Sequence, residues 1–73
     1  MEAQEIFELI VKADERIKYA TADRTGTRAR QAREILERAI EEARAIGNDA
    51  LVAQAEQRLA DLANLTGRGE EEP

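Results

Sequence analysis

The sequence predicts an all-α protein, a three-helix up-down-up bundle, and three observations support this. Apolar residues recur at steps of three and four along three segments, which places them on one face of an α-helix. Alanine, present 14 times, favours helices because it loses no side-chain entropy on folding. The single proline is the last residue, and no segment shows the alternating pattern of a strand.

The first helix is expected at about residues 3–22. Its apolar stripe steps by four, three, four and three residues, through Ile6, Ile10, Ala13, Ile17 and Ala20. Three further apolar residues widen this stripe: Phe7, Leu9 and Val11. We therefore expect this helix to touch more than one neighbour and Phe7 to lie in the core.

The second helix is expected at about residues 27–46. Its stripe runs through Ala29, Ala32, Leu36, Ala39, Ala43 and Ile46. Gly26 can take the left-handed conformation that ends the preceding helix, and Thr27 can cap the new one with its hydroxyl group. Ion pairs between residues four apart are expected on the outer face: Arg30–Glu34, Arg33–Glu37, Glu34–Arg38 and Arg38–Glu42. Gly47 is expected to end this helix.

The third helix is expected at about residues 49–65, with Asn48 or Asp49 as its N-cap. Its apolar stripe comprises Val52, Ala55, Leu59 and Leu62. Thr66 and Gly67 are expected to stop it. The sequence thus predicts one domain at 1–66 and a disordered acidic tail at 67–73, because the tail has no apolar residue to bury.

Residues 32–62 resemble a helical hairpin of the tetratricopeptide family. Ala32, Leu36 and Ala39 match the family's small, bulky, small spacing, and the turn "ARAIGND" is similar to its A-x-x-x-G-D turn. The Trp, Gly-Tyr and Pro positions of the usual repeat are not filled here, and any tight helical hairpin needs small residues at its crossing. The resemblance implies protein–protein interaction rather than chemistry.

The composition argues against an enzyme. The chain has no histidine, cysteine, serine or tryptophan, which removes the usual nucleophiles, bases and zinc ligands. Neighbouring carboxylates such as Glu41 and Glu42 point about 100° apart on a helix, so they do not converge on a substrate. We therefore assign no catalytic residue, no metal ligand and no cofactor.

The charge distribution limits the kinds of partner that the protein is expected to bind. The net charge is −5, and the acidic N-terminus is unlike the basic start of a signal peptide. No run approaches the ~18 apolar residues of a membrane span. A soluble cytoplasmic protein is expected, and a uniformly acidic body argues against nucleic acid as a partner.

One stretch departs from the acidic background, and it carries four arginines without an acid: Arg24, Arg28, Arg30 and Arg33. Cations at the start of a helix oppose its dipole. These arginines either pair with nearby acids such as Asp14, Glu15 or Asp23, or bind a phosphate or an acidic segment of a partner. A third alternative is that they meet the acidic end of a second copy packed antiparallel.

The expected function is a small interaction or structural module. The other two helices are too few to cover the whole apolar surface of the first helix, so we predict a homodimer. The residues expected near its interface are Ile6, Phe7, Leu9, Ile10 and Val11. The alternative is an anion-binding regulator that contacts nucleic acid or a phosphorylated or acidic ligand through the arginine cluster.

Overall fold

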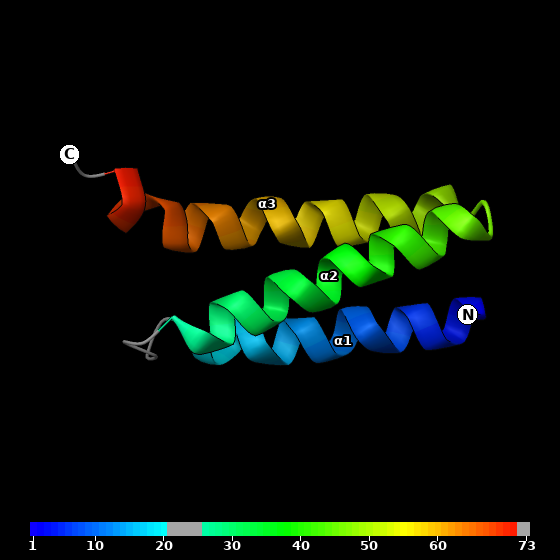
Figure 1. Cartoon of the computed structure of the whole chain (residues 1–73), viewed down its shortest axis with the longest axis horizontal. Helices are drawn as coiled ribbons and strands as arrows, with labels where there is room; N and C mark the ends of the chain where they lie inside the picture. The colour runs from blue at the N-terminus through cyan, green and yellow to red at the C-terminus, as the bar shows by residue number, and fades with distance from the viewer. Residues whose placement is uncertain (21–25, 72–73) are drawn as a thin grey trace.

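Three α-helices make up the fold. The structure, a computed structural model, describes the backbone of residues 1–20 and 26–71 and the side chains of residues 1–20 and 26–65. α1 spans Ala3–Ala20, α2 spans Thr27–Ala45 and α3 spans Asp49–Glu71. α2 lies between α1 and α3 and runs antiparallel to both (Figure 1). The described residues contain no strand, so the predicted all-α three-helix bundle is confirmed.

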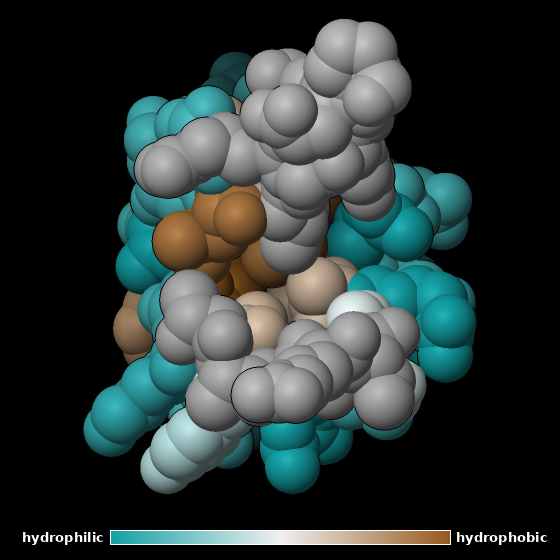
Figure 2. All heavy atoms as spheres, turned by 90° about the vertical axis from the view of Figure 1, so that its left-hand side faces the viewer, coloured by the Kyte–Doolittle hydropathy of each residue, from teal (hydrophilic) through white to brown (hydrophobic). Residues whose placement is uncertain are grey.

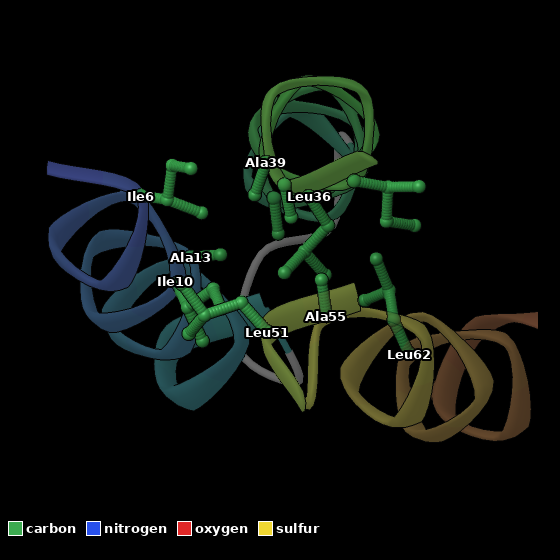
Figure 3. Close-up of a cluster of buried hydrophobic side chains, with 11 residues drawn as sticks. Ile6, Ile10, Ala13, Leu36, Ala39, Leu51, Ala55 and Leu62 are labelled. Atoms are coloured by element: carbon green, nitrogen blue, oxygen red, sulfur yellow. The ribbon is translucent and has the colours of Figure 1, made fainter. Parts of the chain in front are cut away.

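The core is formed largely by the three predicted apolar stripes, with Ile40 and Leu51 added from beside them. Its buried residues are Ile6, Ile10 and Ala13 from α1, Ala32, Leu36, Ala39, Ile40 and Ala43 from α2, and Leu51, Ala55 and Leu62 from α3. Figure 3 shows Leu36 pointing from α2 into the space between α1 and α3. α1 and α3 each pack more extensively on α2 than on one another. The alanines of α2 suit this position because small side chains let helix axes approach closely.

Two residues expected in the core are exposed instead. Phe7 is 47% exposed and Ile46 is 44% exposed. Phe7 directly follows the buried Ile6, so helix geometry turns it by about 100° away from the core. Ile46 is the C-cap of α2, with φ −100° and ψ 5°, so it no longer continues the helical stripe.

The start of α2 differs from the expected cap. Gly26, with φ 75°, takes the predicted left-handed conformation, but it is itself the N-cap of α2. Its carbonyl oxygen accepts a hydrogen bond from the Arg30 N–H at 3.0 Å. Thr27 is the first helical residue and the N-cap residue, Gly26, makes no side-chain cap bond, so the prediction that Thr27 is the N-cap is wrong. The predicted end of the first helix beyond Ala20 falls on residues 21–25, which lie outside the described residues.

The short turn between α2 and α3 provides hydrogen-bond partners for backbone groups at the end of α2 and the start of α3. The Asn48 N–H donates to the Ala43 carbonyl at 2.9 Å, and the Gly47 N–H donates to the Arg44 carbonyl at 3.1 Å. These two bonds form a Schellman motif, which needs Gly47 at its positive φ of 69°. The Asn48 side chain then caps α3, because its Oδ1 accepts from the Leu51 N–H at 3.1 Å.

The third helix is longer than the sequence predicts. Its backbone is helical to Glu71, so the expected stop at Thr66-Gly67 is wrong. A glycine ends a helix when it takes a positive φ, as Gly47 does, and otherwise only weakens the helix by about 1 kcal/mol. The expected disordered tail at 67–73 therefore overlaps the end of α3, and its last two residues lie outside the described residues.

Candidate interaction surfaces

The five residues expected at a self-association surface divide into two groups. Ile6 and Ile10 are fully buried in the core, so the expectation that they contribute to an interface is wrong. Leu9 is half-buried against the core. Phe7 and Val11 are exposed, at 47% and 42% respectively. The structure therefore leaves two of the five side chains available to a partner.

Phe7 and Val11 belong to a single stripe along α1, exposed except for the half-buried Asp14, which we call the α1 face: Phe7, Val11, Asp14 and Lys18. Steps of four, three and four residues keep these side chains on one side of a helix. Asp14 shows which neighbour this side of α1 lies next to, because its carboxylate contacts Arg58 of α3. The α1 face thus lies beside α3 and away from the part of α1 that packs on α2.

The contact between Asp14 and Arg58 was not predicted from the sequence. Arg58 Nε donates to Asp14 Oδ1 at 3.2 Å and to Oδ2 at 3.4 Å. A further bond, from the Arg58 guanidinium to the Gln54 carbonyl at 3.5 Å, holds the arginine along α3. Both side chains stay partly exposed, at 32% and 44%, so water screens the pair and its contribution to stability is small. Asp14 is consequently paired with α3 and not with the arginine cluster.

The arginine cluster lies at the start of α2. The Arg28 guanidinium carbon is 5.9 Å from the centre of the Tyr19 ring, a cation–π geometry that joins α2 to the end of α1. Lys18 approaches the same ring at 5.8 Å. Arg30 and Arg33 are exposed. Arg24, the fourth arginine, lies outside the described residues.

The four ion pairs expected along the outer face of α2 do not form. Over the part of the chain that the structure describes, Arg30, Arg33 and Arg38 make no ion pair with a carboxylate. Exposed pairs gain little because holding two long side chains together costs entropy. The ion pairs found on α2 instead include Arg44–Glu56, from its last turn to α3 at 3.1 Å, and Glu42 with the N-terminal ammonium of Met1 at 3.6 Å.

Apolar surface is also exposed at the end of the bundle where α1 ends and α2 begins. Figure 2 looks at this end and shows apolar atoms flanked by hydrophilic side chains. The C-terminal part of α3 reaches the same end (Figure 1). It carries Leu65, which is 47% exposed.

Two kinds of site are not found among the described residues. No three acidic, histidine or cysteine side chains there come together in a way that could hold a metal ion. None of the helices, as far as they are described, combines the length and apolar character needed to cross a bilayer. Comparisons with protein-family models, with curated proteins and with solved structures found no match to the chain.

Proposed function

We propose that this chain is a small non-enzymatic interaction or structural module that acts in the cytoplasm and self-associates as a homodimer through α1. The observation that carries the proposal is the exposure of Phe7 and Val11 on one side of that helix. Fully burying such a side chain is worth about 1.5–3 kcal/mol, so covering the exposed half of each is worth about half of that. An interface centred on an aromatic side chain is also the common arrangement among protein complexes.

The tetratricopeptide-like hairpin is part of this proposal. Ala32, Leu36 and Ala39, the three residues that carry the resemblance, are all fully buried in the helix contacts. That arrangement supports a role as an interaction scaffold, because these three residues hold the helices together while Phe7 and Val11 stay exposed on α1.

Self-association is tested by removing the exposed apolar side chains. We expect Phe7→Ala and Val11→Ala each to raise the dimer dissociation constant about tenfold, because the change occurs in both copies and the two losses of apolar burial together come to about 1.5 kcal/mol. Sedimentation velocity over a concentration series measures this. Tyr19→Ala is the matched control, since it removes a similarly exposed aromatic ring from another side of α1. A monomeric wild-type chain at high micromolar concentration would contradict the proposal.

A second candidate function is anion binding at the start of α2. The specific observation is that Arg30 and Arg33 are exposed and make no ion pair with Glu34 or Glu37. Exposed guanidinium groups without these ion pairs suit a carboxylate or phosphate ligand, which they can bind with two parallel hydrogen bonds.

Anion binding is tested with a poly-glutamate peptide and, in a separate arm, single-stranded DNA. We expect the peptide to bind with an affinity that falls steeply with salt, and the Arg28/Arg30/Arg33→Ala variant to lose that binding. The control matched for charge compares Arg30/Arg33→Ala with Arg38/Arg44→Ala, whose arginines lie farther along the same helix. Equal loss in the control would show that net charge alone is responsible, and no binding at low salt would remove this candidate.

A further inference from the structure

We infer that the junction of α1 and α2 is a phosphate-binding site, in which Arg16 and Arg28 bind a phosphate dianion beside Tyr19. The ligand class is inorganic phosphate or a phosphate monoester, which carry the same anionic oxygens. The inference does not depend on self-association. It also differs from the second candidate function, because Arg30 and Arg33 lie about 160° and 140° around α2 from Arg28.

The inference starts from the guanidinium group of Arg16. Among the side chains that the structure describes, Arg16 Nε alone is a buried polar atom without a hydrogen-bond partner. Arg58 is also half-buried, yet its Nε donates to both carboxylate oxygens of Asp14. Arg16 makes no ion pair with any described carboxylate. A buried donor of a charged group is costly without a partner, so a ligand that accepts from it is favoured.

The sequence around Arg16 offers no acid to neutralise it. On a helix surface, the neighbours of a side chain are the residues three and four positions away. For Arg16 these are Lys12, Ala13, Tyr19 and Ala20. The adjacent acid in the sequence, Glu15, lies about 100° farther around α1. This side of α1 therefore carries two cations, Lys12 and Arg16, followed by an aromatic ring with a hydroxyl group.

The fold brings a second guanidinium group to the same place. Figure 1 shows the end of α1 beside the start of α2. The Arg28 guanidinium carbon lies 5.9 Å from the centre of the Tyr19 ring. Tyr19 is in turn a helix-surface neighbour of Arg16, three residues along α1. Both arginines thus adjoin one ring, and the ring is 54% exposed, so a ligand can reach it from solution.

Two guanidinium groups beside one ring suit a dianion. Each presents paired N–H donors that match two oxygens of a phosphate group. The Lys18 ammonium, 5.8 Å from the centre of the same ring, adds further positive charge. Arg16 is half-buried rather than enclosed, so turning its guanidinium group brings Nε to the ligand. A carboxylate carries one negative charge and would neutralise only one of the two arginines, which favours phosphate.

Isothermal titration calorimetry of the full chain tests this site, with inorganic phosphate in one arm and methyl phosphate in another. We expect saturable binding in at least one arm, and the tighter arm identifies the source of the phosphate group. We expect Arg16→Lys to raise the dissociation constant about tenfold, because lysine keeps the charge but loses the paired N–H donors. Acetate, a monoanion, is expected to bind more weakly than phosphate.

The matched control is Arg44→Lys, which makes the same change in an arginine that pairs with Glu56 near the other end of α2. We expect this control to bind phosphate as the wild-type chain does. Tyr19 fluorescence gives a second readout, because the chain has no other tyrosine and no tryptophan. The fluorescence should change over the same range of phosphate concentration, and an unchanged signal during saturable binding would place the ligand elsewhere and overturn the inference.

Arg30/Arg33→Ala separates this site from the second candidate function. We expect this variant to weaken phosphate binding less than Arg16→Lys does, because its arginines lie on another side of α2. Binding that is lost in Arg30/Arg33→Ala and kept in Arg16→Lys would overturn the inference and support the second candidate. Equal weakening by Arg16→Lys and Arg44→Lys, or no saturable binding of either phosphate at low salt, would also overturn it.

Discussion

Replacing Leu36 with alanine is expected to unfold a large fraction of the protein at 25 °C. Leu36 is fully buried on α2 and points between the other two helices (Figure 3). Leucine-to-alanine changes in a core cost about 2–5 kcal/mol, because apolar contact is lost and a cavity remains. A domain of this size has a net stability of only about 3–5 kcal/mol, so the loss is comparable with the total.

Circular dichroism at 222 nm with a urea titration measures this effect. The matched control is Leu65→Ala, since Leu65 is 47% exposed and already contacts water. We expect the control to change the free energy of unfolding by less than about 1 kcal/mol. A Leu36→Ala variant whose unfolding midpoint matches that of the control would show that Leu36 is not a central core residue.

Enlarging a buried alanine is expected to have the second largest effect. Ala39 is fully buried on α2, where its small side chain allows a neighbouring helix to approach. Ala39→Leu adds three carbon atoms to a filled space, which costs typically 1–3 kcal/mol through displaced helices and strained rotamers. The helices cannot separate here without also breaking the contacts of Leu36 and Ile40.

The control for this change is Ala45→Leu, at the exposed last residue of the same helix. Leucine and alanine are both good helix formers, so the control alters helix propensity as the test variant does while filling no buried space. Thermal unfolding followed by circular dichroism should show a lower midpoint for Ala39→Leu alone. Equal midpoints would mean that α2 does not pack tightly at Ala39.

The sequence predicted the helices and the core well because periodicity encodes which side of a helix is apolar. Ile6, Ile10 and Leu36 were placed in the apolar stripes, and all three are fully buried. The starts of α2 and α3 were also predicted to the residue. The N-cap of α2 was harder, because Gly26 and Thr27 can each precede a helix and the choice depends on the backbone of the whole turn.

The surfaces were predicted less well, because they depend on how the helices sit against one another. Phe7 was expected in the core, yet it lies about 100° around α1 from Ile6, on a side that neither α2 nor α3 fully covers. The contact between Asp14 and Arg58 joins residues 44 positions apart in the chain. Only the relative register of α1 and α3 brings these two side chains together, and this register cannot be read from the charge pattern of a single helix.

The turn at Gly47 and Asn48 has a consequence for how this protein can respond to a partner. Its two Schellman bonds and the Asn48 cap would all have to break for α3 to swing relative to α2. Each such bond contributes about 0.5–1.5 kcal/mol, and none is easily replaced within so short a connection. This corner is therefore not a hinge. Binding should move α2 and α3 together as a rigid body, with shape change confined to other parts of the chain.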